Sequence, residues 1–256
     1  MAWNPEIYNK FKEQRFQPFY DCLAFVIQKP AMRVIDLGCG TGELTSKLAS
    51  NLPEPAVVVG IDSSEEMLAG SERFQHPALQ FRLDSIETAI NTTDKWDLVF
   101  SNAALQWVEN HLTLLPGLIS TLVPGGQLVV QIPAQQHNIT NLMLTGLANS
   151  TDFRNALEQW IRPSPVLETH EYARILFQHG GENITVMEKI YPIIVKDFQA
   201  LYEWVSGTAL LPYLERLGTN DQEHFINLFK EKLKAEFPGQ PAFYPFKRII
   251  FAATFP

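Results

Sequence analysis

The sequence predicts an α/β fold built on a doubly wound, mostly parallel sheet, and three observations support this. Short apolar runs bounded by turn residues predict buried strands at 32–36, 56–60, 79–83, 96–100 and 127–132. Helical patterns separate several of them, at 43–50, 64–73 and about 111–122. A glycine-rich turn joins the first strand to the first helix. Strands that alternate with helices in this way are typical of a sheet covered by helices on both faces.

The second half of the chain departs from this alternation. Helices are predicted at 139–148 and 151–161, before the breaker Pro163-Ser164-Pro165, and they indicate an insertion. A helix at 170–179 and strands at 184–190 and 246–252 return to the sheet, which then has seven strands, while 197–217 and 222–236 are helical. The expected parts are N-terminal lid helices in 1–30, a ligand-binding core in 31–134, a helical insertion in 135–165, and the remaining core in 166–256 with a helical cap at about 197–240.

Composition narrows the class of protein. The 256 residues are 46% hydrophobic and 19% charged, and no apolar run reaches membrane-spanning length, so we expect a protein that does not enter a membrane. No basic segment followed by an apolar stretch opens the chain, which favours a cytoplasmic location. The two cysteines provide neither a disulfide framework nor a zinc site, and no metal is expected. A net charge of −8 argues against nucleic acid as a partner. Oligomeric state is left open, with a monomer as the default.

The glycine-rich turn is the first candidate site. Gly38, Gly40 and Gly42 follow Asp36 at the first strand-to-helix turn, where open α/β sheets bind ligands. A dinucleotide fingerprint has the spacing G-x-G-x-x-G, whereas this turn has G-x-G-x-G. Asp36 would repel a pyrophosphate but could engage the ammonium of a methionine moiety. The turn therefore favours S-adenosylmethionine over NAD, and an ordinary tight turn is the remaining alternative.

Two further carboxylates follow strand ends at suitable positions. Asp62 lies 24 positions after Gly38, where it could accept hydrogen bonds from ribose hydroxyls or cap a helix. Asp84 could accept from an adenine amino group or belong to a turn. Met67 could pack on the nucleoside or in the core. The predicted cofactor-binding residues are Asp36, Gly38, Cys39, Gly40, Asp62, Ser63, Met67, Asp84, Ser85, Ile86, Ser101 and Asn102.

These motifs resemble a known family. The segments 36–42 and 60–64, the position of Asp84 and Pro124-Gly125-Gly126 resemble the class I, Rossmann-like methyltransferases. More narrowly, Trp3-Asn4-Pro5 and the segments 101–107, 131–133, 203–205 and 212–214 are similar to the trans-aconitate 2-methyltransferase group. The resemblance implies transfer of a methyl group from S-adenosylmethionine to a carboxylate of a small polycarboxylic acid. Leu211 stands where that group commonly has an arginine that could hold a substrate carboxylate.

Three alternatives remain open. The segment 102–107 also resembles the malonyl-carrier-protein O-methyltransferase of biotin synthesis, which esterifies a free carboxylate. Another small-molecule methyltransferase and a non-catalytic module that binds S-adenosylmethionine are the other two. A carboxylate is already ionised at neutral pH, so esterification needs no general base, and we assign no catalytic residue beyond positioning and desolvation.

The acceptor side is predicted after the fourth strand and in possible lids. Asn102, Gln106 and Trp107 follow that strand. Tyr8 and Arg15 share one face of an N-terminal helical pattern. This segment either closes over the site as a lid or only packs on the core. Arg15, Arg174 and Arg248 are the candidates for holding a carboxylate. His111 is expected to be structural. The predicted substrate and lid residues are Trp3, Tyr8, Arg15, Asn102, Gln106, Trp107, Tyr213 and Arg248.

Overall fold

The computed structural model describes residues 12–256, and the side chains from residue 16 onward. Trp3 and Tyr8 lie outside the described residues, as does the side chain of Arg15. The chain divides into two compact units. We call Arg15–Pro133, Pro165–Lys189 and Arg248–Pro256 the sheet unit, and 12–14, Ala134–Ser164 and Ile190–Lys247 the helical unit. The two helical segments that the sequence analysis treats separately, the insertion and the cap, therefore fall in one unit.

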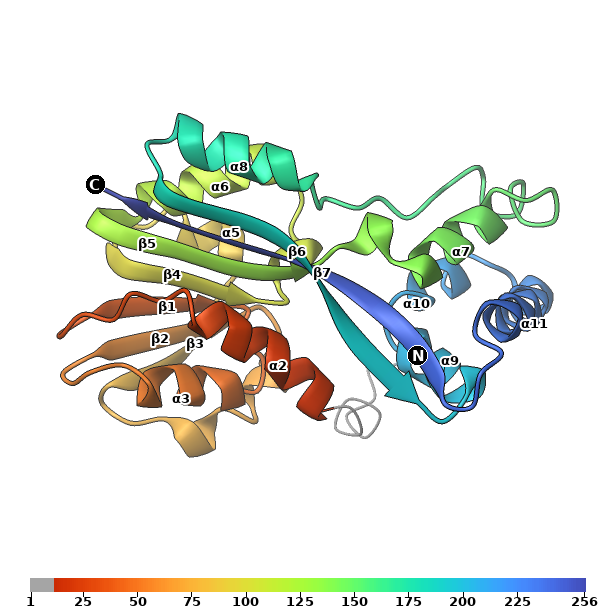
Figure 1. Ribbon diagram of the computed structural model, residues 1–256, viewed down its shortest axis with the longest axis horizontal. Coiled ribbons are helices and arrows are strands. Elements are labelled where there is room, and N and C mark those ends of the chain that lie inside the picture. Colours follow the sequence, from red (N-terminus) through yellow and green to blue (C-terminus); the bar gives the residue numbers. More distant parts are fainter. Residues whose placement is uncertain (1–11) are drawn as a thin grey trace. The chain divides into compact units, whose positions relative to one another are not determined.

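A seven-stranded sheet has the order β3-β2-β1-β4-β5-β7-β6. The first five strands of this order are parallel and β7 runs antiparallel to β5, which confirms the predicted mostly parallel sheet (Figure 1). Because the chain passes from β3 back to β4 beside β1, the carboxyl ends of β1 and β4 form the switch point where such sheets bind ligands. The strands are β1 (Arg33–Leu37), β2 (Val57–Asp62), β3 (Leu79–Leu83), β4 (Trp96–Asn102), β5 (Leu122–Pro133), β6 (Glu182–Val195) and β7 (Ala242–Phe255).

Helices cover both faces of this sheet. On one face Phe19 of α2 and Leu48 of α3 are buried in a cluster with Val34 and Phe100. The opposite face is covered by α8 (Figure 1). Tyr172 of α8 stacks there on Phe251 of β7 at 4.5 Å between ring centroids. The helices of the sheet unit are α2 (Lys12–Leu23), α3 (Glu43–Ser50), α4 (Glu65–Leu68), α5 (Ile86–Ala89), α6 (His111–Ser120) and α8 (Thr169–Gln178), with short 3-10 turns η1 (Glu72–Phe74) and η2 (Leu105–Trp107).

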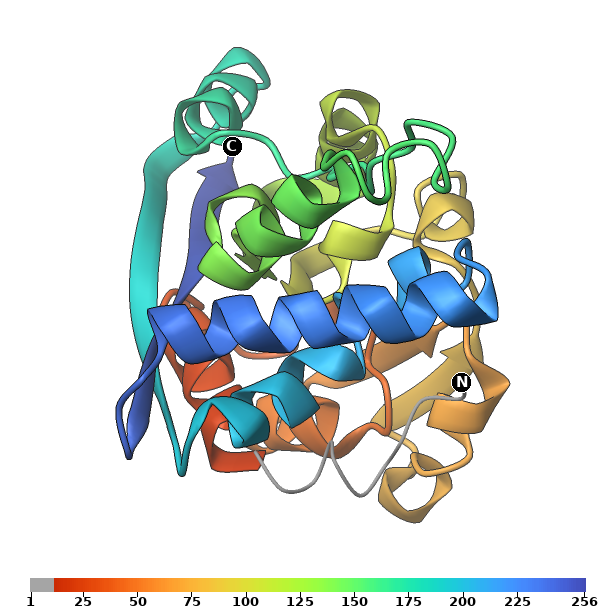
Figure 2. The same ribbon diagram turned by 90° about the vertical axis from the view of Figure 1, so that its right-hand side faces the viewer.

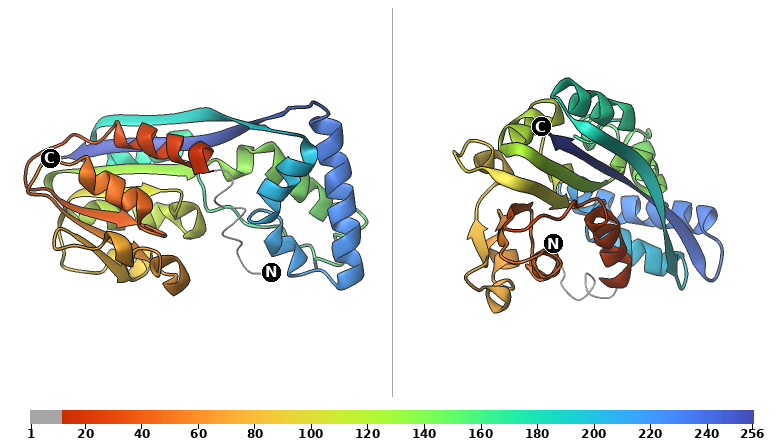
Figure 3. Two further views of the ribbon diagram at one scale, coloured as in Figure 1. Left: turned by 90° about the horizontal axis from the view of Figure 1, so that it is seen from below. Right: turned by 60° about the vertical axis from the view of Figure 1, so that its left-hand side comes forward.

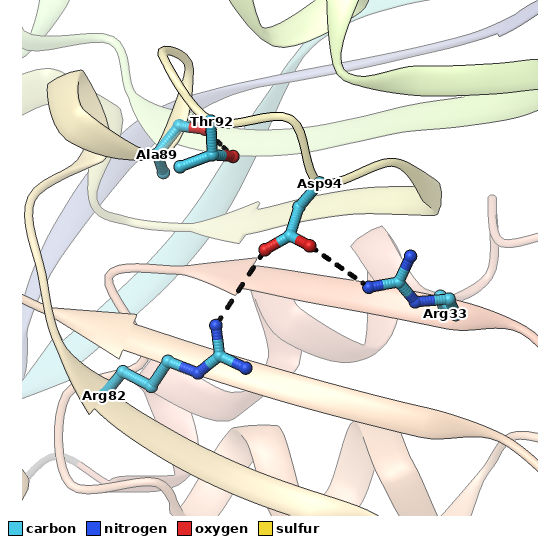
Figure 4. A network of polar contacts seen from close by, with 5 residues as sticks. All are labelled: Arg33, Arg82, Ala89, Thr92 and Asp94. Atoms are coloured by element: carbon cyan, nitrogen blue, oxygen red, sulfur yellow. Dashed lines mark hydrogen bonds and ion pairs between the residues drawn. The ribbon is translucent and has the colours of Figure 1, made fainter.

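A small polar network ties the loop before β4 to the sheet. The carboxylate of Asp94 lies between Arg33 and Arg82, at 3.4 and 3.9 Å, and the hydroxyl of Thr92 donates to the carbonyl of Ala89 (Figure 4). All three charged side chains are about half exposed, so solvent screens these ion pairs and each contributes little stability.

The helical unit has its own aromatic core. Phe225 and Phe229 of α11 are fully buried with Val205 of α9 and Leu144 of α7. Figure 2 shows α11 running alongside α7 and α9. The ends of β6 and β7 that extend into this unit remain neighbours, as Figure 3 shows. The helices are α7 (Ile139–Ala148), α9 (Phe198–Ser206), α10 (Leu211–Leu214) and α11 (Thr219–Glu236), with the 3-10 turn η3 (Gln135–His137).

Some predicted helices are wrong or too long. The predicted helix 151–161 is replaced by turns over 151–159. Two helical hydrogen bonds form, from Arg154 to Ser150 and from Leu157 to Phe153, before the chain enters the left-handed region at Glu158 (φ 51°) and Gln159 (φ 62°). The burial of Phe153 and Leu157, four positions apart, imitates a helical pattern there. The predicted helix 64–73 is split into α4 and η1, and 197–217 into α9 and α10. Among the described helices, none combines the length and apolar character needed to cross a membrane.

Candidate active site

The glycine loop, residues 38–42, joins β1 to α3 at the switch point. The amides of Gly38 and Cys39 both donate to the carbonyl of Ile61, at 2.8 and 2.9 Å, so the loop is tied to the end of β2. Gly38 has φ 75°, and a Cβ added there would lie 2.1 Å from the Cβ of Ala104. Only glycine satisfies both the backbone conformation and this close contact. The predicted sharp turn is therefore present, and it packs directly on the segment that follows β4.

Asp62 braces this loop from the end of β2. One carboxylate oxygen accepts from the amide of Gly40 at 2.8 Å, and the other accepts from the amide of Ser64 at 2.9 Å. The hydroxyl of Ser64 in turn caps α4 by accepting from the amide of Met67. A carboxylate offers about four acceptor positions, so Asp62 retains the capacity to accept from ligand hydroxyls. Asp62 therefore fixes the loop geometry and presents acceptors beside it.

Asp36 is buried beneath the loop. The hydroxyl of Thr45 donates to its carboxylate at 2.6 Å. Burial raises the pKa of Asp36 to about 7, the hydrogen bond from Thr45 opposes that shift, and the charge of Asp62 adds to it. Near neutral pH this carboxyl is therefore divided between its two forms, and a cation bound nearby would favour the ionised one. Burial likewise raises the pKa of Cys39, so its thiol stays protonated.

The remaining predicted cofactor residues lie on adjacent elements. The terminal methyl of Met67 is 3.1 Å from a Cβ built on Gly40, so Met67 borders the loop. Asp84 follows β3, where its amide donates to the carbonyl of Asp62 at 3.0 Å, and its carboxylate accepts from the amide of Ser85. The Ser85 hydroxyl caps α5 and Ile86 is buried, while Ser63 is exposed. These contacts are those of a turn aspartate, which was the alternative to a role in binding adenine. A contact between Asp84 and adenine stays a prediction.

The acceptor side begins at the carboxyl end of β4. The Ser101 hydroxyl donates to the carbonyl of Leu37 at 2.9 Å, which links β4 to the start of the glycine loop. Asn102 lies opposite Gln131 of β5 in the sheet register. Gln106 in η2 donates through Nε2 to the carbonyl of Ala103 at 2.6 Å. The next residue, Trp107, is 58% exposed, so it is not a core residue.

Three amide side chains at this edge carry buried atoms whose hydrogen-bonding capacity is unused within the described part of the chain. They are Oδ1 of Asn102, Oε1 of Gln106 and Nε2 of Gln131. A buried polar atom without a partner is unfavourable, and such atoms in a folded protein indicate a ligand or bound water. Gln131 was not among the predicted site residues, although a polar side chain inside the apolar run 127–132 is a signal that could have revealed it.

The cationic candidates differ in their surroundings. Arg248 of β7 is buried and donates through Nη1 to Oε1 of Gln131 at 3.1 Å. It lies opposite Pro133 in the register, and therefore at the same edge of the sheet as Asn102. Arg174 instead lies on α8 as a half-exposed residue 3.6 Å from Glu171. Arg248 is thus the described candidate that the fold brings to the switch-point edge.

Tyr213 and His111 are both buried. Tyr213 belongs to the helical unit, where its ring stacks on Phe225 at 5.6 Å and meets Trp160 edge-on. His111 begins α6, and both ring nitrogens have partners within the sheet unit, which agrees with its expected structural character. In the part of the chain that the structure describes, no group of three or more His, Cys, Asp or Glu side chains could hold a metal ion.

Comparison with known proteins agrees with this geometry. A family model described as a methyltransferase domain matches residues 28–181. Among solved structures, the YcgJ protein of Bacillus subtilis superposes with a TM-score of 0.62 at 14% identity, covering 93% of this chain and 98% of that one. A Haemonchus contortus phosphoethanolamine N-methyltransferase, solved with S-adenosylhomocysteine, gives a TM-score of 0.56 at 19% identity, covering 94% of this chain and 52% of that one. The fold and the glycine loop define an S-adenosylmethionine-dependent methyltransferase.

Relatives with higher sequence identity show to which methyltransferase family the chain belongs. A Deinococcus radiodurans protein named trans-aconitate 2-methyltransferase is 42% identical over 262 residues, covering 100% of this chain and 99% of its own. A Variovorax paradoxus protein of the same name is 34% identical, covering 93% of this chain and 91% of its own. The chain belongs to the trans-aconitate 2-methyltransferase family.

Proposed function

We propose that this protein transfers a methyl group from S-adenosylmethionine to a carboxylate oxygen of a small polycarboxylic acid, with trans-aconitate as the first candidate. The observation that carries the proposal is 42% identity along the whole chain to a relative of that name. The unused amide atoms at the carboxyl ends of β4 and β5 support it, because they provide polar contacts for a small ligand at the switch point.

The residues around the glycine loop fit the methyl donor. At Gly38 and Gly40 the main chain lies too close to Ala104 and Met67 for a Cβ. Asp36 offers a carboxyl group for an ammonium, and Asp62 has further acceptor positions for ribose hydroxyls. When bound, S-adenosylmethionine supplies a methyl group that is already activated by a sulfonium. The proposed cofactor set also retains Cys39, Ser63, Met67, Asp84, Ser85, Ile86, Ser101 and Asn102.

The acceptor requires orientation more than proton transfer. A carboxylate is ionised at neutral pH, so the protein has only to align one of its oxygens and remove water from it. We assign the binding of a carboxylate to Arg248 and Gln131, because a guanidinium matches a carboxylate in a two-pronged geometry and Nε2 of Gln131 is an unused donor beside it. Arg248 then provides the positive charge that the group's arginine would provide at the position of Leu211. Asn102, Gln106 and Trp107 line the other side of the acceptor.

The test uses the purified protein with methyl-labelled S-adenosylmethionine and a panel of acids. The panel contains trans-aconitate, cis-aconitate, citrate, isocitrate and a malonyl thioester. We expect a base-labile methyl ester of trans-aconitate. A base-stable product would show a different acceptor atom, and ester formation only with the malonyl thioester would replace the proposed substrate. No labelled ester from any of these acids would overturn the acceptor class.

We also infer a cytoplasmic, monomeric enzyme with a small acidic molecule as its partner. A net charge of −8 disfavours nucleic acid, and the proposed donor and acceptor are both small metabolites. Cell fractionation and analytical ultracentrifugation test these two points. Recovery in the membrane fraction would contradict the first, and a stable dimer at nanomolar concentration would contradict the second.

A further inference from the structure

The loop between β4 and α6 is held in an unusual backbone conformation. We call Ala103–Asn110 the acceptor loop. It begins at Ala103 with φ 58° and ends at Asn110 with φ 59°, both in the left-handed region that is unfavourable for residues with a Cβ. Such conformations persist only where surrounding contacts hold them in place. The contacts at each end of the loop therefore show what maintains its shape.

The first end is held by the sheet and by the glycine loop. The amide of Ala103 donates to the carbonyl of Gln131 at 2.8 Å, and Gln106 donates to the carbonyl of Ala103. Ala104 packs so closely on Gly38 that an added Cβ would approach within 2.1 Å. This end of the acceptor loop thus depends on the same residues that shape the cofactor site.

His111, which directly follows the second end at Asn110, belongs to a buried chain of hydrogen bonds that returns to Leu105. The amide of Leu167 donates to the hydroxyl oxygen of Tyr172 at 3.0 Å. The hydroxyl oxygen of Tyr172 lies 2.7 Å from Nδ1 of His111. On the other side of the ring, Nε2 lies 2.9 Å from the carbonyl oxygen of Leu105, within the acceptor loop. Both side chains are almost fully buried.

A carbonyl can only accept, so Nε2 of His111 carries the proton given to Leu105. Burial lowers the pKa of His111 and so favours the neutral ring. Nδ1 then accepts the proton of the Tyr172 hydroxyl, whose oxygen accepts from the amide of Leu167, and His111 has a single tautomer. Its ring joins the acceptor loop to α8, and Tyr172 is itself fixed by stacking on Phe251.

We propose that His111 and Tyr172 are positioning residues for the methyl transfer, acting through Leu105 to hold the adjoining Gln106 and Trp107 toward the acceptor. The inference rests on the proposed function, since that function places Gln106 and Trp107 on the acceptor side of the site. Neither positioning residue touches a reacting atom. Their effect is to keep the acceptor loop in the conformation that its own backbone disfavours.

The matched pair Tyr172→Phe and Tyr244→Phe tests the proposal. Each substitution removes one buried hydroxyl and keeps the ring; Tyr244 pairs with Thr140 within the helical unit, whereas the acceptor loop belongs to the sheet unit. Tyr172→Phe should lower kcat about tenfold or more at saturating donor and acceptor, because small misplacement of reacting groups is costly. Tyr244→Phe should leave kcat unchanged. Affinity for S-adenosylhomocysteine, measured by calorimetry, should stay unchanged in both. Equal kcat in the two variants would overturn the proposal.

Two readouts do not depend on the acceptor. Amide hydrogen exchange over 103–110 should accelerate in Tyr172→Phe but not in Tyr244→Phe. In the wild type, nitrogen-15 NMR of His111 at neutral pH should show a neutral ring protonated on Nε2, because that nitrogen donates to the carbonyl of Leu105. A ring protonated on Nδ1, or exchange that does not change, would overturn the inference even if the acceptor were identified correctly. A wild type that forms no base-labile methyl ester would instead reject the proposed function and leave these two readouts interpretable.

Discussion

The hydroxyl of Thr45 donates to the buried carboxylate of Asp36 across 2.6 Å, directly beneath the glycine loop. Because this bond favours the ionised carboxylate, it lowers a pKa that burial raises to about 7. The ionised form is the one that we propose to engage the ammonium of S-adenosylmethionine. The balance between burial and this hydrogen bond therefore controls the charge of the cofactor site near neutral pH.

The first prediction concerns Thr45→Val. Loss of the hydrogen bond should raise the pKa of Asp36 further and weaken cofactor binding at neutral pH by about 1 to 2 kcal/mol, with recovery as the pH rises. Calorimetric titration between about pH 6 and pH 9 measures this. Thr121→Val is the matched control, since Thr121 is a buried threonine whose hydroxyl donates to the carbonyl of Leu118. Equal affinities for the two variants across this pH range would contradict the assignment of Asp36.

The second prediction concerns the stability of the ligand-free protein. The folded-state pKa of Asp36 lies above the ordinary value of 3.8, so the stabilisation from this group is complete below that value and is lost as the pH rises through about 7. Asp36→Asn removes the titration. Its free energy of unfolding, relative to wild type, should rise by about 1 to 4 kcal/mol between about pH 5 and pH 8. Urea denaturation at both pH values measures it, and a constant difference would show that Asp36 titrates normally.

The third prediction concerns the contact between Gly38 and Ala104. Gly38→Ala places a Cβ in the left-handed region and against Ala104, so it should destabilise the fold by about 2 kcal/mol or more and abolish cofactor binding. Gly146→Ala is the control: Gly146 lies inside α7, and an added Cβ meets nothing within 4 Å. This control should stabilise the protein by up to about 1 kcal/mol. Thermal unfolding distinguishes the two, and full cofactor affinity in Gly38→Ala would contradict the close packing described above.

The fourth prediction concerns Arg248. Arg248→Gln should raise the KM of the acceptor about tenfold or more, because a charge-assisted contact with a carboxylate is lost, while the affinity for S-adenosylhomocysteine stays unchanged. The unchanged affinity also shows that the variant is folded. Arg174→Gln removes a half-exposed arginine on α8 and should leave both parameters unchanged. A KM that does not respond to Arg248→Gln would assign the acceptor carboxylate to another residue.

Local sequence pattern was sufficient to place the proposed cofactor residues Asp36, Gly38 and Asp62 at one edge of the sheet. The spacing of Asp36, Gly38 and Asp62 around two strand ends predicts their positions, because consecutive parallel strands end at the same edge. The structure adds that Asp62 also braces the loop through Gly40. That contact joins residues 22 positions apart and follows from the packing of β2 beside β1.

The acceptor half depends on contacts that no local pattern contains. Arg248 meets Gln131 across 117 positions, and the antiparallel register of β5 and β7 brings the pair together. The bond between His111 and Tyr172 spans 61 positions and requires α8 to pack beside α6. Sequence reasoning placed Arg248 among three candidates, and only the fold separates it from Arg174.

Methyl transfer to trans-aconitate is tested most directly by mass spectrometry of this acid after incubation with the protein and S-adenosylmethionine, before and after mild base. We expect a product that carries one additional methyl group in wild type and returns to the free acid in base. Its amount should fall sharply in Arg248→Gln at low acceptor concentration. Unmodified trans-aconitate in the presence of bound donor, or a methylated product that survives base, would contradict it.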